Sequence, residues 1–240
     1  MRGFRDVWTY LSASPLLHLT LTLVAYQVGL AIYRRGNRNP LLNPVLLAVL
    51  MLVTIMTLTR TRYETYFDGA QFVHFLLGPA TVALAVPLYR QIATVRRSAL
   101  AIMTAIIAGS LTASGSAVAI AWALGGSRDA LIALAPKSVT APVAMGIAER
   151  LGGLPSLTAV LVILTGILGA IMGTALLNAL GIKDWSARGL AMGTASHGIG
   201  TARALQVNGI AGAFSGLAMG LNALATALLL PLLWKLFAAV

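Results

Sequence analysis

The chain has 240 residues, of which 58% are hydrophobic and 10% are charged, and its mean hydropathy is +0.87. A soluble domain usually has about a quarter charged residues, so the composition predicts a polytopic membrane protein in a lipid bilayer. The formal net charge of +11 does not indicate nucleic-acid binding, because the basic residues cluster in short breaks between apolar runs, as expected for membrane anchoring. The absence of cysteine excludes disulfides, thiol catalysis and cysteine metal sites.

We expect an all-α, polytopic membrane protein with about eight membrane segments, several of them discontinuous or re-entrant, in one transmembrane domain over residues 1–240. The segments lie at about 15–33, 41–59, 69–89, 98–124, 130–149, 156–180, 187–206 and 209–238. Breaks at 34–38 and 90–97 each hold three arginines and are separated by two segments. We therefore expect both breaks to be cytoplasmic.

The second and third segments each contain a proline next to polar residues. Pro44 follows Asn43 at the start of the second segment. This proline either occupies an ordinary first helical turn or begins a helix inside the membrane, with Asn43 facing a cavity. In the third segment His74 precedes Gly78 and Pro79, and this Gly-Pro pair is expected to interrupt the helix.

Small residues are dense in three later segments, where they let helices approach closely. The fourth segment includes Gly109-Ser110-Leu111-Thr112-Ala113-Ser114-Gly115-Ser116. The sixth segment contains Gly166, Gly169 and Gly173. The last segment contains Gly212, Gly216 and Gly220, at a strict four-residue spacing. These glycines indicate contact faces, either within the scaffold or between copies in a homo-oligomer.

The fifth segment contains the stretch Pro136-Lys137-Ser138-Val139-Thr140-Ala141-Pro142 in an otherwise apolar run. Two prolines remove two backbone donors and interrupt the helical ladder. A lysine near the middle of a membrane segment costs roughly 2.5–3.5 kcal/mol on insertion scales. Lys137 therefore either faces a cavity or an anionic ligand, or extends its ammonium group to the interface.

The seventh segment reads Gly193-Thr194-Ala195-Ser196-His197-Gly198-Ile199-Gly200-Thr201-Ala202-Arg203. Its hydroxyls, histidine and glycines are unsuited to a lipid-facing surface, so they are expected to line protein or water. For His197 the alternative is a structural hydrogen bond. For Arg203, which is near the end of the segment, the alternative is a position at the membrane interface.

A weak internal repeat is visible between the two halves. Asn43-Pro44 resembles Ala141-Pro142, and His74 before Gly-Pro-Ala-Thr resembles His197 before Gly-Ile-Gly-Thr-Ala. Paired interrupted segments indicate a transporter site near the bilayer midplane. Eight full crossings would make the repeats parallel, whereas inverted repeats require an odd offset or a re-entrant segment, and both arrangements stay open.

The chemistry of these residues favours a small anion. All six acidic residues lie near segment ends, and no paired carboxylates, activated nucleophile or metal-ligand spacing occurs, so we expect neither an enzyme nor a metal or other cofactor. The candidate substrate-binding residues are Lys137, Ser138, Thr140, Thr194, Ser196, His197, Thr201, Arg203 and Asn43. The expected helix breaks are Pro44, Gly78, Pro79, Pro136, Pro142, Gly198 and Gly200. Without an intramembrane carboxylate relay, His74 and His197 are the candidates for proton coupling, and facilitated exchange is the alternative.

With these residues in view, the sequence resembles the LrgB/CidB family of bacterial membrane proteins over about residues 15–235. Two long motifs carry the resemblance. The first is Pro136-Lys137-Ser138-Val139-Thr140-Ala141-Pro142 followed by Ala144-Met145. The second is Ala187-Arg188-Gly189-Leu190-Ala191-Met192-Gly193-Thr194-Ala195-Ser196-His197-Gly198 through Ala202-Arg203. Shorter matches are Leu42-Asn43-Pro44, Tyr66-Phe67-Asp68-Gly69, Pro79-Ala80-Thr81-Val82-Ala83-Leu84-Ala85 and Pro87-Leu88-Tyr89.

The resemblance implies a multi-pass protein of the bacterial inner membrane with one of two functions. The family includes the plastid glycolate/glycerate translocator and bacterial pyruvate uptake systems, which implies transport of small monocarboxylates such as glycolate, glycerate, pyruvate or lactate. It is also described as holin/antiholin-like, modulating murein hydrolases and cell lysis. A separately encoded LrgA/CidA-type membrane partner is expected in either case. Lys137 favours transport, because a lysis regulator would leave this residue unexplained.

Overall fold

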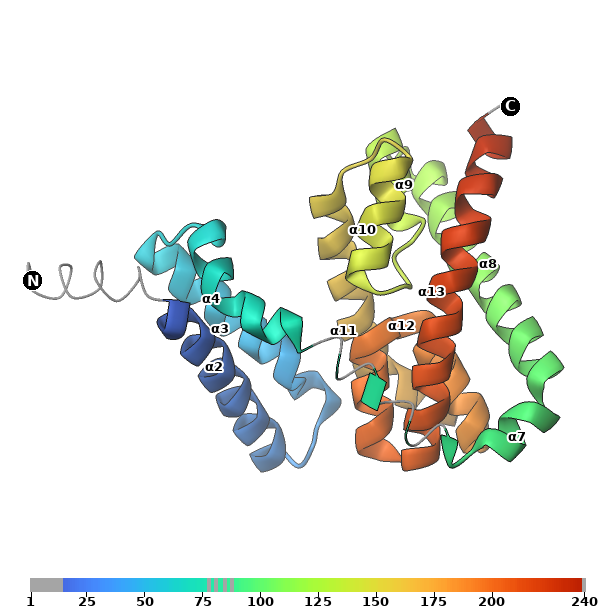
Figure 1. The fold of residues 1–240 in the computed structure, drawn as a ribbon, viewed down its shortest axis with the longest axis horizontal. Helices are drawn as coiled ribbons and strands as arrows, with labels where there is room; N and C mark the ends of the chain where they lie inside the picture. Colours follow the sequence, from blue (N-terminus) through green and yellow to red (C-terminus); the bar gives the residue numbers. More distant parts are fainter. Residues whose placement is uncertain (1–14, 77–78, 80–81, 84–85, 87–88, 239–240) are drawn as a thin grey trace, which may run out of the picture. The chain divides into compact units, whose positions relative to one another are not determined.

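A computed structural model describes residues 15–238, apart from 77–78, 80–81, 84–85 and 87–88 (Figure 1). Every regular element among the described residues is helical, which confirms the all-α prediction. Contacts divide the chain into two compact units, Met1–Ala83 and Leu84–Val240. The expected single domain over the whole chain stays a prediction.

The first unit contains α2 (Pro15–Arg35), the 3-10 turn η1 (Pro40–Leu42), α3 (Pro44–Thr59) and α4 (Tyr63–Phe75). Helix α2 packs against both α3 and α4. Pro44 lies in the first turn of α3, where its missing N–H costs nothing. A Cβ on Gly29 of α2 would lie 2.8 Å from the Pro44 carbonyl oxygen. Glycine at this position therefore allows the start of α3 to approach α2.

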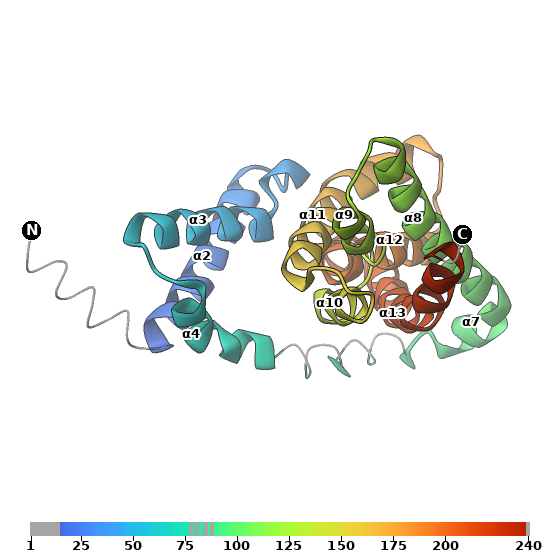
Figure 2. The ribbon, with the colours of Figure 1, turned by 90° about the horizontal axis from the view of Figure 1, so that it is seen from above.

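The second unit contains the remaining described helices. They are α7 (Ile92–Arg97), α8 (Ala99–Ala123), α9 (Arg128–Leu134), α10 (Ala141–Arg150), α11 (Pro155–Ala179), α12 (Trp185–Val207) and α13 (Gly209–Ala238). The most extensive packing is between α12 and α13, and α11 covers another side of α12. Helix α10 lies between α11 and α13 in both views (Figures 1 and 2).

Side chains that accept hydrogen bonds define where two of these helices begin. Ser127 accepts from the Ala130 amide at 3.3 Å and starts α9, and Asp184 accepts from the Ala187 amide at 2.8 Å and starts α12. Such N-caps satisfy amides that have no partner within the helix. The loop before α12 is thereby fixed, and with it the register of the polar seventh segment.

Four described helices are long and apolar enough to cross a membrane, and eight full spans are not confirmed. The four are Leu16–Arg35, Ala99–Ala123, Pro155–Ala179 and Gly209–Lys235. Helix α3 is apolar but shorter, and the expected fifth segment is divided into the short helices α9 and α10. The expected third segment lies partly outside the described residues, since α4 ends at Phe75. Re-entrant segments are not confirmed either.

Candidate functional site

The expected interruption of the fifth segment is present between α9 and α10, at residues 135–140. Pro136 lies inside this break, whereas Pro142 lies in the first turn of α10 and starts that helix rather than interrupting one. Val139 is buried in the break and packs against Val162 of α11. The break is therefore part of the core of the second unit.

Lys137 is half-buried in this break. Its ammonium Nζ donates to the Ser138 hydroxyl at 3.4 Å, and Ser138 is buried. Among the described residues, the recorded ion pair joins Arg62 and Glu64. No described carboxylate therefore lies within ion-pair distance of Lys137.

A second break lies inside α12, at His197. The backbone of His197 has φ 41° and ψ −134°, which is not helical. Such a conformation costs a non-glycine residue of order 1–3 kcal/mol and persists only where the surroundings fix it. The expected breaks at Gly198 and Gly200 are thus placed one to three residues too late. Gly200 instead leaves room for Ser196, whose Cβ would lie 2.5 Å from a Cβ at position 200.

The surroundings of His197 hold this strained residue in place. Its Nε2 donates to the Val162 carbonyl of α11 at 2.9 Å, since a carbonyl can only accept. Thr201 donates to the His197 carbonyl at 2.8 Å, and the Thr201 hydroxyl also lies 2.9 Å from that of Ser215 on α13. His197 and Thr201 are buried. Both side chains therefore fix the second break to α11 and α13.

Glycines on α11 provide the space for the second break. A Cβ on Gly166 would lie 2.6 Å from the His197 Cε1 atom. A Cβ on Gly169 or Gly173 would clash with Ser196 or Met192. The predicted glycine face of the sixth segment is thus a contact face within the chain. The polar side of α12 packs against this glycine face.

Asn222 of α13 connects the two breaks and was not predicted. This residue is 1% exposed, and its Nδ2 donates to the Ser138 carbonyl at 3.3 Å and to the Thr194 carbonyl at 3.0 Å. Its Oδ1 accepts from Thr226 at 3.5 Å. Burying an amide without such partners costs about 1–3 kcal/mol. A lone asparagine within an apolar helix was the sequence signal that could have identified it.

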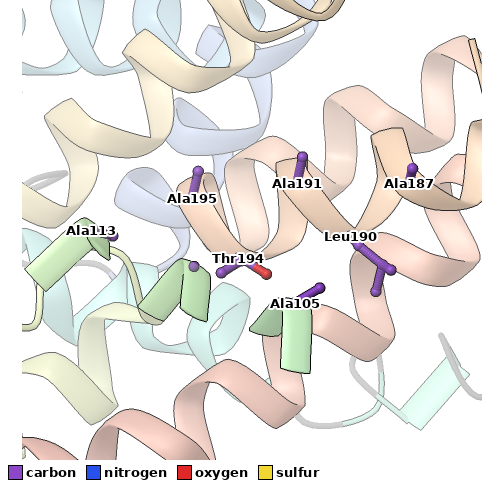
Figure 3. A pocket seen from close by; sticks show the side chains of 8 residues that line it. Ala105, Ala113, Ala187, Leu190, Ala191, Thr194 and Ala195 are labelled. Atoms are coloured by element: carbon purple, nitrogen blue, oxygen red, sulfur yellow. The ribbon is translucent and has the colours of Figure 1, made fainter. Parts of the chain in front are cut away.

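A groove between α8 and α12 reaches this region. It has a volume of about 340 Å³ and is lined mostly by alanines, including Ala105, Ala113 and Ala191. Of its lining residues Thr194 is the one with a polar side chain, and Figure 3 shows it among these alanines. Gly109 on α8 would bring a Cβ to 3.0 Å from the Thr194 Cγ2. The small residues predicted in the fourth segment thus border the polar stretch of α12.

Arg203 lies in a different environment. It is half-buried and lines a narrow crevice together with Trp185 and Arg188. The volume of this crevice is about 10 Å³, which has room for at most about one water molecule. Arg188 is buried and donates to the Ile182 carbonyl at 2.7 Å and to the Asn178 Oδ1 at 2.7 Å. The structural role of this buried arginine was not predicted.

The other predicted residues belong to the first unit. Asn43 caps α3 through its Oδ1, which accepts from the Val45 amide at 2.9 Å and the Leu46 amide at 3.2 Å. The simpler interpretation of Asn43 and Pro44, a turn followed by a first-turn proline, matches this geometry. The side chain of His74 and the residue Gly78 lie outside the described residues. Pro79 lies beyond the end of α4.

The structure thus brings together the breaks that contain Lys137, Ser138 and Thr140 on one side and Thr194, Ser196 and His197 on the other. Thr140 is half-buried and precedes α10 as its N-cap. Lysine, hydroxyls and two helix starts inside one core form a donor-rich environment without a described acid. Such an environment suits a small anion. The role of each residue as a ligand stays a prediction.

The fold and site define a helical membrane protein with two interrupted helices tied to a third. A model of the LrgB-like family matches residues 22–236, and the chain belongs to this family. It is 35% identical to the holin-like protein CidB of Staphylococcus epidermidis over 228 residues, which cover 95% of this chain and 98% of that protein. It is 36% identical over 219 residues to YxaC of Bacillus subtilis (91% and 95%) and 32% identical over 222 residues to the holin-like protein CidB of Staphylococcus aureus (92% and 96%). No solved structure matches the chain.

Proposed function

We propose that the chain transports small monocarboxylates, of the glycolate, glycerate, pyruvate or lactate type, across the bacterial inner membrane. The observation that carries this proposal is Lys137, a cation in a helix break of a membrane protein with no described carboxylate within ion-pair distance. A charge held there at a cost of roughly 2.5–3.5 kcal/mol needs a compensating partner. A carboxylate supplied by the substrate meets that need.

The neighbouring groups match the rest of such a substrate. The Ser138 hydroxyl lies beside the lysine, and Thr140 marks the start of α10, whose N-terminal dipole favours negative charge. Hydroxyls of the second break can bond an α-hydroxyl or keto oxygen. Because the His197 Nε2 is held by Val162, facilitated exchange is favoured over a proton relay through this residue. The chain acts as a carrier rather than an enzyme, and needs no metal.

Uptake of labelled glycolate, glycerate, lactate and pyruvate into proteoliposomes tests this function. We expect saturable uptake by the wild type and a loss of roughly 10- to 100-fold in apparent affinity for Lys137→Ala, the range given by a charge-assisted hydrogen bond of about 1.5–3 kcal/mol. Lys183→Ala is the matched control, because Lys183 is exposed. Saturable uptake by Lys137→Ala at wild-type affinity would contradict the assignment of the site.

A second candidate function is holin/antiholin-like control of murein hydrolases and lysis. The observation in its favour is the name of the staphylococcal relatives, holin-like protein CidB. This function predicts dye leakage through oligomers without saturable flux of any of the four acids. Adding an LrgA/CidA-type membrane partner to both assays tests whether either activity depends on that partner.

The glycines of α13 are candidate contacts between copies of the chain in a homo-oligomer. A Cβ on Gly212 would clash with Leu205 of the same chain, so this glycine serves internal packing. Gly216 is half-buried, and Gly220 is exposed with open space around it. We propose that any oligomer contact on this helix lies at the Gly220 end.

A further inference from the structure

We propose that Asn222 is a positioning residue that holds the two helix breaks at a fixed separation and thereby sets the geometry of the carboxylate site. The inference rests on the proposed function for the identity of the ligand. It goes beyond that function by assigning a role to a residue on α13, outside both sequence motifs.

The first argument concerns the two carbonyls that Asn222 binds. In a continuous helix the Ser138 carbonyl would accept from the amide of residue 142, but residue 142 is proline and has no N–H. The Thr194 carbonyl would accept from the amide of Gly198, which follows the non-helical His197. Each break therefore disturbs one carbonyl, and the same amide nitrogen serves both, at 3.3 Å and 3.0 Å.

The second argument concerns the orientation of the amide. Both carbonyls can only accept, so the nitrogen must face them and the oxygen must face Thr226. The Thr226 hydroxyl lies 2.8 Å from that of Ser110 on α8, and both residues are buried. The oxygen side of Asn222 thus contacts a hydroxyl that is paired with α8, while the nitrogen side contacts the two breaks.

The third argument concerns the consequence for binding. Ser138 follows Lys137 directly, and Thr194 precedes Ser196 and His197 by two and three residues. Any shift between the two carbonyls therefore shifts the candidate ligand groups on one break relative to those on the other. Misplacement of such groups by about 1 Å is enough to weaken recognition severely.

Uptake kinetics of Asn222→Leu test the role in positioning. Leucine has a similar size and removes both donors, so we expect the KM for the transported acid to rise at least about 10-fold, with the maximal rate per folded transporter changing much less. Thr226→Val is the matched control, because it removes the hydroxyl on the oxygen side and leaves both amide donors. We expect its KM to stay within about twofold of wild type. An unchanged KM in Asn222→Leu would overturn the proposal.

A second measurement does not depend on transport. The chain has no cysteine, so Ala141→Cys at the start of α10 can be labelled selectively with a small maleimide in detergent. Adding Asn222→Leu should raise the labelling rate several-fold because the first break is no longer held, whereas adding Thr226→Val should not. Equal labelling rates for Ala141→Cys alone and for both double variants would contradict the proposal that Asn222 holds the first break.

The two measurements separate the possible failures. Asn222→Leu could speed labelling even though the wild type takes up none of the four acids. That result would support the role of Asn222 in holding the two breaks and would contradict the proposed transport function. If Asn222→Leu does not fold, Asn222→Ser keeps one donor and should give a smaller rise of both KM and labelling rate. Wild-type values for Asn222→Ser in both assays would then overturn the proposal.

Discussion

At the scale of single residues, buried cations and amides serve different purposes in the second unit. Arg188 donates to carbonyl and amide oxygens at the end of α11 and in the following loop, and its guanidinium lies 5.0 Å from the Trp185 ring centroid. All its recorded partners are neutral parts of the scaffold. Lys137, in contrast, has one recorded hydrogen bond, to the hydroxyl of the next residue. This difference supports a structural role for Arg188 and a ligand role for Lys137.

Replacing Arg188 should therefore destabilise the loop between α11 and α12. We expect Arg188→Met to lower the free energy of unfolding by about 2–3 kcal/mol, because the hydrogen bonds to Ile182 and Asn178 are lost. In detergent this corresponds to a fall in melting temperature of roughly 5–10 °C. Arg150→Met on the exposed side of α10 is the control and should change the melting temperature little. Equal melting temperatures for the two variants would contradict the structural role.

At the scale of elements, the main feature is the seating of α12 on the glycines of α11. A polar helix with a strained residue can be buried only if its partner leaves room for its side chains. Gly166, Gly169 and Gly173 provide that room, one turn apart, for His197, Ser196 and Met192. The spacing of these glycines was visible in the sequence, but their partner helix was not.

A pair of alanine substitutions tests this seating. Gly169→Ala should destabilise the protein by about 1–3 kcal/mol, since the added Cβ clashes with Ser196. Gly220→Ala on α13 has nothing within 4 Å of the added Cβ. It should stabilise slightly, because alanine favours a helix by up to about 1 kcal/mol. Thermal unfolding in detergent measures both changes, and a loss of stability in Gly220→Ala alone would refute this account.

At the scale of the whole molecule, the long apolar helices indicate several membrane crossings, and the arginine clusters predict their orientation. The clusters at 34–38 and 90–97 are expected on the cytoplasmic side, and the short break at 60–62 between them on the opposite side. This orientation stays a prediction.

Single cysteines test the orientation in a chain that has none of its own. In intact cells, Asn37→Cys and Ala93→Cys should resist a membrane-impermeant maleimide, whereas Arg62→Cys should react. These three positions are exposed, so protection would report the membrane rather than burial. After permeabilisation all three should react. Labelling of Asn37→Cys in intact cells would reverse the predicted orientation.

The sequence by itself determined the helical membrane class, the break around Lys137 and the polar character of the stretch 193–203. These features are local: hydropathy, two prolines and a cluster of hydroxyls are each readable within one segment. Local signals did not place the second break, which lies at His197 rather than at the neighbouring Gly198 or Gly200. Nor did they separate Arg203 and Asn43 from the site. Those positions depend on contacts with α11, on a crevice and on a helix cap.

Only the tertiary structure decided how the two motifs meet. Ser138 and Thr194 are separated by 56 positions in the chain, yet their carbonyls share one amide from α13. No periodicity or motif encodes such a contact, because it depends on the packing of α10 and α12 against a third helix. The physical reason is that a backbone carbonyl without its helical partner must find a donor in the buried core. The donor that binds such a carbonyl is determined only when the helices pack together.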